Sequence, residues 1–329
     1  MIRVLSLNLQ HCLPGAGAEQ DAATAALAGA DITAPATARA VLEALAAQIA
    51  DLAPDVVALQ EVDMRQKRSG GLDQAGELTR MLGWEHHRFA AAWAGPVVGM
   101  RRRPLRSPLE RAWDDILAPV HLLTGRGPAG FGNAILSRLA VRSWHVRRLG
   151  RGPATISLRG ERAWNPRSYH LDTSTARTML AARIDAPGAG PAGSLTLAST
   201  HLATRTGMAA RQLAAAWAAL TTLPGPRLLA GDLNMGPGGV ASTGVARPLG
   251  EGPTFPAWGP RERIDHLLTD PWPMGADGLP GAPGASGAVG SPGSADAVGA
   301  PLLRAAAWGT RAFVVSDHVG AWADLEPAS

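Results

Sequence analysis

The chain has 329 residues, of which 46% are hydrophobic, and its formal net charge is +4. These values indicate a globular protein with one large core or two smaller ones, and no run of roughly 18 uncharged apolar residues is present to span a membrane. A single cysteine, Cys12, excludes an internal disulfide and a thiolate-rich metal site.

The amino-terminal segment MIRVLSLNLQ has alternating apolar positions and no small-residue cleavage site. It therefore predicts a strand over 3–9 rather than a signal peptide. We accordingly expect a cytoplasmic protein, and the lone cysteine fits a reducing compartment.

Short apolar strands alternate with helical patterns along the rest of the chain, which favours an α/β fold. Apolar residues recur at helical spacing over 41–52, and Pro54 stops that helix. A second helix follows His201, with Leu213, Trp217 and Leu220 on one face. Strands are predicted at 3–9, 55–61, 131–137, 140–147, 177–184, 195–201, 227–231, 262–269 and 310–315.

Three stretches stand apart from this pattern, at 13–34, 92–129 and 273–306. The last is so rich in Gly, Ala, Pro and Ser that we expect a flexible surface loop there. No shift in composition divides the chain, so we predict a single domain over 1–329. Arginine clusters at 101–111 and 147–151 give weak support for a nucleic-acid partner, because such runs are most often solvated faces.

Polar residues stand at the carboxyl ends of five apolar runs, which is where α/β sheets bind ligands. Charged groups beside a core need partners, and converging carboxylates repel one another unless a cation lies among them. The residues are Asn8 after VLSL, Glu61 after VVALQ, His201 after LTLAST, Asp232 and Asn234 after LLAG, and Asp317 with His318 after AFVVS.

Oxygen ligands of this kind suit Mg²⁺ or Mn²⁺. We predict Glu61 and Asp317 as metal ligands, with Asn8 as a neutral third. The segment RIDHLL places Asp265 at another strand position, where it could accept a hydrogen bond from His318, fix its tautomer and raise its basicity. An Asp–His pair without a serine predicts water as the nucleophile and hydrolysis of a phosphate ester.

The motifs LSLNLQ, LQEVD, FGNAILSR, STHL, GDLN, TFPAWGPRERIDHLL and SDH occur in this order. Together they resemble the endonuclease/exonuclease/phosphatase superfamily, and the resemblance covers most of the chain outside the three stretches set apart above. It implies a four-layer α/β/β/α sandwich in which two mixed β-sheets pack face to face. It also implies a divalent-metal phosphoesterase.

By position, the resemblance makes Glu61 the principal Mg²⁺ ligand, with Asn8 and Asp317 completing or supporting the site. Mn²⁺ is the possible substitute. Gln10 stands where several nucleases of the family carry an acid, which puts a second metal position in doubt.

The resemblance also assigns roles to the remaining residues of the motifs. Asp232 and Asn234 would orient the attacking water and the phosphate, and His201 would donate to a phosphate oxygen. The Asp265–His318 pair would act as general base or phosphate stabiliser, and Asp232 is the alternative base.

The expected partner is a phosphate-ester substrate, with a nucleic acid (DNA or RNA) or another phosphodiester favoured, and we expect a monomer. A phospholipid or phosphoinositide phosphoesterase, similar to a sphingomyelinase, is the alternative. A non-catalytic binding module on the same fold is a third reading, against which the complete residue set argues. GRGPAG at 125–130 fits a dinucleotide pattern but opens no helix, so we interpret it as a loop.

Overall fold

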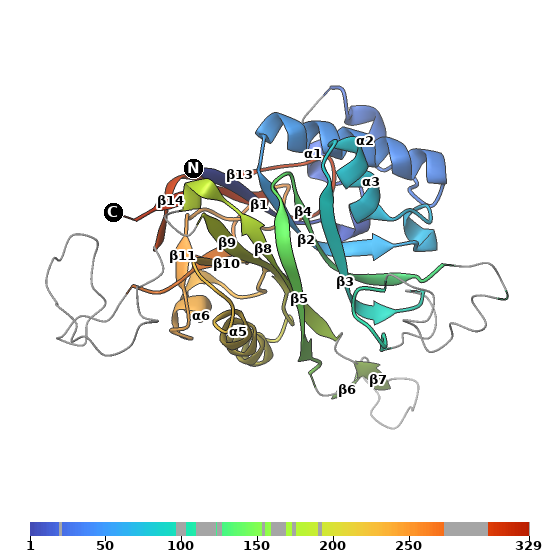
Figure 1. The fold of residues 1–329 in the computed structure, drawn as a ribbon. Coiled ribbons are helices and arrows are strands. Elements are labelled where there is room, and N and C mark those ends of the chain that lie inside the picture. Colours follow the sequence, from blue (N-terminus) through green and yellow to red (C-terminus); the bar gives the residue numbers. More distant parts are fainter. Residues whose placement is uncertain are drawn as a thin grey trace, which may run out of the picture.

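Two β-sheets of six strands pack face to face in the computed structural model, and helices cover their outer faces (Figure 1). The structure describes residues 1–19, 22–96, 103–109, 123, 127–152, 155–158, 169–172, 176–189, 193–272 and 302–328. This is the predicted four-layer α/β/β/α sandwich with two mixed sheets, so the predicted fold class is confirmed.

The first sheet has the strand order β13-β14-β1-β2-β4-β3. β1 runs parallel to β2 and antiparallel to β14, which makes the sheet mixed. Its strands are β1 (Ile2–Asn8), β2 (Val56–Met64), β3 (His86–Ala94), β4 (Gly130–Ser137), β13 (Leu303–Arg311) and β14 (Gly320–Pro327).

The second sheet has the order β11-β12-β10-β9-β8-β5, and β9 and β10 are its parallel pair. Two further strands, β6 (Thr155–Leu158) and β7 (Tyr169–Asp172), form a separate hairpin-like pair. The strands of the second sheet are β5 (Val141–Gly150), β8 (Arg177–Asp185), β9 (Ser194–His201), β10 (Arg227–Asp232), β11 (Arg247–Leu249) and β12 (Asp265–Thr269).

The helices lie on the outside of both sheets (Figure 1). Near the first sheet are α1 (Ala16–Glu19), α2 (Pro35–Leu52) and α3 (Gln74–Met81), and on the second are α5 (Thr206–Leu220) and α6 (Pro237–Ala241). Short 3-10 turns occur at Gln10–Cys12, Ala25–Leu27, Lys67–Ser69 and Pro187–Ala189. None of the described helices is long and apolar enough to cross a membrane.

Alternation along the strands divides the apolar side chains among three layers of core. Leu228 and Ala230 of β10 lie in the core between the sheets, whereas Leu229 lies in the core beneath α5. Because side chains alternate in a strand, the next residue of the first set, Asp232, faces the gap between the sheets. The alternation of apolar residues along β10 therefore directs the carboxylate of Asp232, the last residue of the strand, into this gap.

Polar contacts join the two sheets close to this end of the molecule. Gln60 Nε2 donates to Ser199 Oγ at 3.0 Å, and Ser199 Oγ donates to the carbonyl oxygen of Leu59 at 2.9 Å. Asn133 Nδ2 donates across the gap to the carbonyl oxygen of Thr178 at 2.8 Å. These buried bonds fix one sheet against the other where their polar residues must meet.

Most predicted strands are present, but two predictions need correction and several strands were not predicted. The strand predicted at 310–315 is wrong, because β13 ends at Arg311 and the following residues to 319 form the loop that leads into β14. The strand predicted to end at Glu61 continues to Met64. The structure also has strands that were not predicted, namely β3, β6, β7, β11, β14 and the part of β13 before residue 310.

The predicted flexible loop over 273–306 overlaps a strand at its far end. Residues 303–306 belong to β13, which pairs with β14. This pairing uses backbone hydrogen bonds, which residues such as alanine and glycine can also make. Residues 273–301 of the predicted loop lie outside the described residues.

Ser199→Ala should reduce the free energy of unfolding by about 1–3 kcal/mol, because the substitution removes both hydrogen bonds of a buried hydroxyl. Urea denaturation measures the change. Thr222→Ala, which removes an exposed hydroxyl bonded to the Ala219 carbonyl, is the control and should change stability by less than about 0.5 kcal/mol. Equal losses of unfolding free energy in the two variants would contradict a stabilising role for the Ser199 hydrogen bonds between the sheets.

Candidate active site

The predicted polar residues meet at one end of the gap between the sheets. In the second sheet, His201, Asp232 and Asp265 are register partners on adjacent strands, so their side chains form a row across β9, β10 and β12. Asn8 ends β1 in the first sheet and crosses the gap, where its Nδ2 donates to Asp232 Oδ2 at 3.0 Å.

Asp232 ends β10 with support from its own turn. Asn234 has φ 50°, and its backbone N–H donates to Asp232 Oδ1 at 3.0 Å, while its side-chain Nδ2 donates to the carbonyl oxygen of Leu202. Gly231 precedes the acid because a Cβ there would lie 1.9 Å from the Thr200 carbonyl oxygen. The motif GDLN thus places a fixed carboxylate, rather than a plain turn, at the strand end.

Glu61 reaches the site through a β-bulge rather than a strand end. The register between β2 and β4 shifts between Leu59 and Val62, and Glu61 has φ 52°. A bulge re-aims a side chain, and here the Glu61 carboxylate lies beside Asn8, which hydrogen-bonds to it, and 3.7 Å from His201 Nδ1. Burial is the main reason that the pKa of Glu61 is raised.

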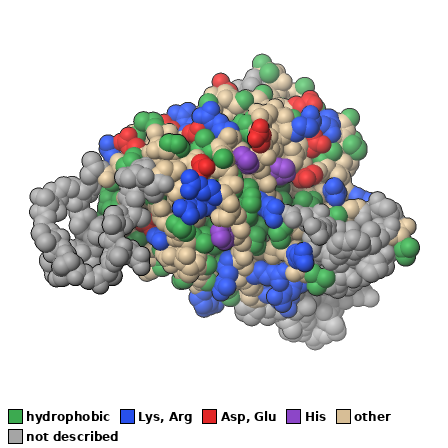
Figure 2. Space-filling model, in the orientation of Figure 1, with side chains coloured by type: hydrophobic (Ala, Val, Ile, Leu, Met, Phe, Trp, Pro, Cys, Tyr) green, Lys and Arg blue, Asp and Glu red, His purple; other side chains and the backbone are tan. Residues whose placement is uncertain are grey.

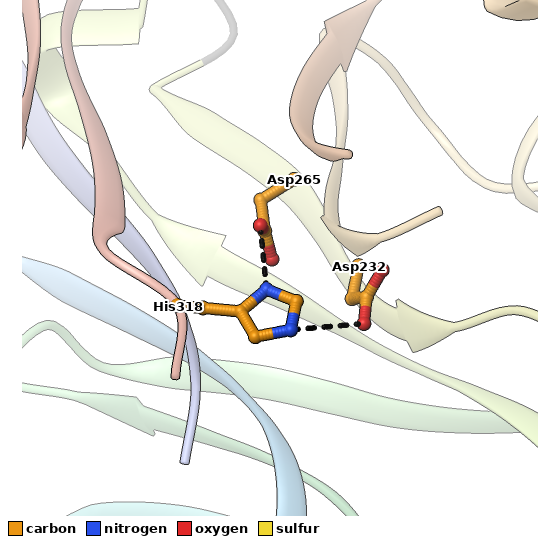
Figure 3. Close-up of side chains that lie close together, drawn as sticks. All are labelled: Asp232, Asp265 and His318. Atoms are coloured by element: carbon orange, nitrogen blue, oxygen red, sulfur yellow. Dashed lines mark hydrogen bonds and ion pairs between the residues drawn. The ribbon is translucent and has the colours of Figure 1, made fainter. Parts of the chain in front are cut away.

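His318 lies between two acids of the second sheet (Figure 3). Its Nδ1 donates to Asp265 Oδ2 at 2.8 Å, as predicted, and its Nε2 faces Asp232 Oδ2 at 3.9 Å. The same Nε2 lies 3.9 Å from Asp317 Oδ1, and the ring of Phe255 packs 5.0 Å from the imidazole. The acceptor on Nδ1 fixes the ring orientation and leaves Nε2 directed at the other carboxylates.

The acids and histidines perturb one another strongly. Burial alone would lower the pKa of His318, but the charge and hydrogen bond of Asp265, with Asp232 and Asp317 nearby, raise it to about 9. Burial, followed by the charge of Asp265, raises the pKa of Asp232 to about 7. Burial and the positive charges of Arg177 and His318 hold the pKa of His201 well below its usual range, so this imidazole is neutral.

Arg177 is a further member of the site that the sequence reasoning did not single out. It starts β8, and the charges of Asp232 and Glu61 act on it while burial lowers its pKa. Its Nε is buried and has no hydrogen-bond partner among the described residues. The only sequence signal was an arginine at the first position of an apolar strand, which is too common to be selective.

Two sets of residues could hold a cation. Asp232, Asp265 and His318 each offer a ligand atom within 4.8 Å of the others, but the Asp265–His318 hydrogen bond already occupies one atom of each. Glu61 and Asp317 have side chains that are 26% and 29% exposed, so their carboxylates alone among the predicted acids reach the mouth of the site. Their oxygen chemistry, with the amide of Asn8 behind them, fits a hard divalent ion.

Gln10 stands at the position that bears on a second metal ion, where several nucleases of the resembled family carry an acid. Its backbone N–H donates to Asn8 Oδ1 at 2.9 Å, which orients the amide, and its backbone has φ 44°. The residue therefore contributes a hydrogen bond to the site but no carboxylate.

A sequence model of the Endonuclease/Exonuclease/phosphatase family matches residues 5–318. The chain belongs to this family. No curated protein matches it. The match includes all eight predicted site residues, from Asn8 to His318, and also Arg177.

Solved structures of family proteins have the same fold at low identity. The endonuclease/exonuclease/phosphatase from Beutenbergia cavernae DSM 12333 is 19% identical, covers 100% of this chain and 72% of its own, and has a TM-score of 0.54. A mannosyl-6-phosphatase from Bacteroides thetaiotaomicron VPI-5482 is 11% identical over 99% of both chains, with a TM-score of 0.53. D. rerio TDP2, complexed with single strand DNA product, is 12% identical over 99% of this chain and 98% of its own, with a TM-score of 0.50.

Asp265→Asn should lower the pKa of His318 from about 9 to about 6.5 or below, because the variant loses the charge that most raises it while burial still disfavours the imidazolium. NMR titration of the His318 ring in EDTA measures the shift. Asp51→Asn, at a carboxylate that is 73% exposed, is the charge-matched control. A His318 pKa that stays near 9 in Asp265→Asn would reject this assignment.

The same pair makes stability depend on pH. Because folding raises the pKa of His318, its stabilising effect is complete below about pH 6.5 and is lost as the pH rises through about 9. The melting temperature of the unaltered protein should therefore fall between pH 6 and pH 10 by an amount that includes this loss, and Asp265→Asn should lack that part of the fall. Melting temperatures of both proteins, measured in EDTA at the two pH values, test this.

Proposed function

We propose that this protein is a divalent-metal-dependent phosphoesterase that cleaves phosphodiesters by direct attack of an activated water. The observation that best supports this proposal is the buried row of side chains Asp265, His318 and Asp232. From the opposite sheet, the Asn8 amide donates a hydrogen bond to the Asp232 carboxylate. The group combines an oriented imidazole, a hydrogen-bonded acid and, at the mouth, the carboxylates of Glu61 and Asp317. No serine or cysteine is needed as nucleophile.

Glu61 and Asp317 would hold Mg²⁺, or Mn²⁺ in its place, with Asn8 supporting them. When bound, the cation would draw negative charge from a phosphate oxygen and so favour attack at phosphorus. Glu61 suits this task because burial raises its pKa and a cation would relieve the cost of its charge. The other steps depend on side chains of the chain itself.

The histidines and the GDLN turn would handle the phosphate and the water. His201, neutral and 3.4 Å from Asp232 Oδ2 through Nε2, would donate to a phosphate oxygen. Asp232 would position the water with Asn234. The proton would pass to Asp232 below about pH 9, where His318 is already protonated, or to Nε2 of His318 above that pH; Nε2 lies 3.9 Å from Asp232 Oδ2. Asp265 would keep His318 in the tautomer and orientation that this transfer requires.

Arg177 would add a fixed positive charge against the phosphate. Its guanidinium lies near the Glu61 and Asp232 carboxylates, and its buried Nε has no partner among the described residues. A phosphate oxygen would supply the missing acceptor. Guanidinium groups match phosphate geometry, so this placement supports a phosphate ester as substrate.

A nucleic acid is the substrate class that the arginine-rich composition favours. The similarity to TDP2 with its single strand DNA product supports that choice, whereas the similarity to a mannosyl-6-phosphatase shows that the fold also serves a phosphomonoester. Hydrolysis of sphingomyelin or of a phosphoinositide in preference to DNA and RNA would instead support the phospholipid alternative. Absence of any turnover would support a binding module.

We also propose that the enzyme is a cytoplasmic monomer with a single domain. The family match over 5–318 supports one domain, because it leaves little of the chain outside it. The burial of the only cysteine, Cys12, fits a compartment in which no disulfide is required. Light scattering of the purified protein tests the monomer.

Glu61→Gln should reduce hydrolysis of bis(p-nitrophenyl) phosphate in Mg²⁺ by at least about a hundredfold, since the variant keeps the shape of the side chain and loses its charge. Excess EDTA should abolish turnover of the unaltered protein. Glu43→Gln, at an exposed acid of α2, is the matched control and should keep full activity. Full activity in EDTA would overturn metal dependence.

Asp265→Asn should depress turnover by about 10²–10⁴-fold with little change in KM, because general acid–base catalysis supplies a factor of this size. The double variant with His318→Ala should be scarcely slower than His318→Ala alone, since residues that act as a unit are not additive. Losses that multiply in the double variant would show that the two residues act separately.

A further inference from the structure

The carboxylate of Asp265 is held by fewer hydrogen bonds than the carboxylate of Asp232. Asp232 accepts one bond on each oxygen, from the backbone N–H of Asn234 on Oδ1 and from Asn8 Nδ2 on Oδ2. Asp265 accepts the bond from His318 Nδ1 on Oδ2 (Figure 3), but its Oδ1 is buried and has no hydrogen-bond partner among the described residues. Rotation of a carboxylate about its Cβ–Cγ bond is soft, so a single hydrogen bond does not fix its plane. Asp265 therefore needs a second contact to hold His318 in one orientation.

Arg263, two residues before Asp265, has donors without an acceptor. Figure 2 shows Lys and Arg side chains at the surface of the molecule, where water satisfies their N–H groups. In Arg263, by contrast, Nη2 donates to the carbonyl oxygen of Leu249 at 3.0 Å, while Nε and Nη1 are buried and have no acceptor within the described part of the chain. Buried polar groups are normally paired, because leaving them unpaired costs free energy. Unpaired donors and an unpaired acceptor thus belong to residues that are two positions apart.

The bond to Leu249 brings the guanidinium of Arg263 alongside Asp265. Leu249 is the last residue of β11 and pairs with Leu267 of β12, which lies two residues beyond Asp265. To reach the Leu249 carbonyl oxygen, the side chain of Arg263 runs back along β12 toward Leu267 and so passes Asp265. Leu249 and Leu267 both pack in the core between the sheets, and Asp265 shares the face of Leu267 because side chains alternate along a strand. The guanidinium and the free carboxylate oxygen therefore lie in the same buried region.

The charges around Arg263 support this placement. Burial lowers the pKa of Arg263, whereas the negative charges of Glu251 and Asp265 act in the opposite direction. Glu251 has the larger effect on that pKa, but it is exposed and water screens its charge, whereas Asp265 is only 1% exposed. A positive charge close to a buried carboxylate offsets part of the free energy that its burial costs. Asp265 is therefore the acid that has more to gain from this arginine.

We propose that Arg263 is a positioning residue for Asp265, whose Oδ1 it holds through a bound water molecule that accepts from Nε and Nη1. A buried water makes about three hydrogen bonds, and these two donors with the one carboxylate oxygen supply that number. The proposal rests on the proposed function, because orientation of the Asp265–His318 pair affects turnover only if the pair serves the reaction. Arg263 touches neither the substrate nor the cation, so it acts on the rate of the chemical step and not on substrate binding.

Hydrolysis of bis(p-nitrophenyl) phosphate in Mg²⁺ tests this role. Arg263→Gln should reduce kcat roughly 10–100-fold with KM unchanged, the loss typical when a residue that orients a functional group from behind is removed. Arg247→Gln is the matched control and should keep both constants. Arg247 also donates through Nη2 to a carbonyl oxygen, that of Leu303, and its Nε is likewise buried with no acceptor among the described residues. The acid whose charge acts on it, however, is Asp270, which lies outside the site.

Two further variants show whether Arg263 acts through Asp265. Arg263→Gln should slow Asp265→Asn scarcely further, because residues that act as a unit are not additive. Millimolar guanidinium chloride should restore part of the turnover of Arg263→Ala, whereas sodium chloride at the same concentration should not. Arg263→Lys, which keeps the charge but has one nitrogen in place of three, should have an intermediate kcat and replaces Arg263→Gln if that variant does not fold. Losses that multiply in the double variant, or an equal loss of kcat in Arg247→Gln, would overturn the proposal.

The NMR signal of the His318 Nδ1 proton, recorded in EDTA without substrate, tests the positioning separately from the reaction. The buried bond to Asp265 should give a resolved downfield signal in the unaltered protein and in Arg247→Gln. In Arg263→Gln the signal should broaden or disappear, because a carboxylate that turns lets this proton exchange with water.

The two measurements separate the two proposals. If the unaltered protein turns over the phosphodiester while Arg263→Gln keeps both its kcat and this NMR signal, the proposed function stands and the role of Arg263 fails. If the unaltered protein shows no turnover in Mg²⁺ but Arg263→Gln loses the signal, the proposed function fails and Arg263 still positions Asp265.

Discussion

The buried carboxylate of Asp232 is the constraint on which the arrangement of the site depends. Only 2% of the residue is exposed, and a charge in such a place is costly unless polar groups surround it. The Asn8 amide, the Asn234 backbone N–H and the two histidines supply those groups. They come from both sheets, so the carboxylate can be satisfied only when the sheets are packed in one register.

Backbone strain occurs at three residues beside this carboxylate and its neighbours. Glu61, Asn234 and Ser316 all have positive φ, and none is glycine. Ser316 nevertheless accepts the His318 backbone N–H on its Oγ, which helps to hold the histidine at the site. Positions of this kind persist only where surrounding contacts determine them, and here the hydrogen-bonded core between the sheets provides those contacts.

Apolar runs of defined length and period predicted an α/β fold and the convergence of polar residues, whereas the four layers were implied by the resemblance of the motifs to the family. Buried strands such as β9 and β10 carry no charged residue between their first and last positions, so the polar residue at each carboxyl end is easily recognised. β3 and β14 lack that signal, since HHRFAAAWA begins with charged and polar residues and GAWADLEP contains two acids. Their strand conformation comes from pairing with β4 and with β1 and β13, which local pattern does not report.

Long-range register accounts for the remaining differences between expectation and structure. Arg177 belongs to the site because β8 pairs with β9, and Glu61 because a bulge redirects it; neither fact is visible in a short window of sequence. The same register places Arg148 of β5 two strands from His201, whereas the sequence gave the arginines of 147–151 only weak support as a nucleic-acid contact. A sheet thus converts a long separation along the chain into a fixed lateral distance, which brings His201, Asp232 and Asp265 side by side on three adjacent strands.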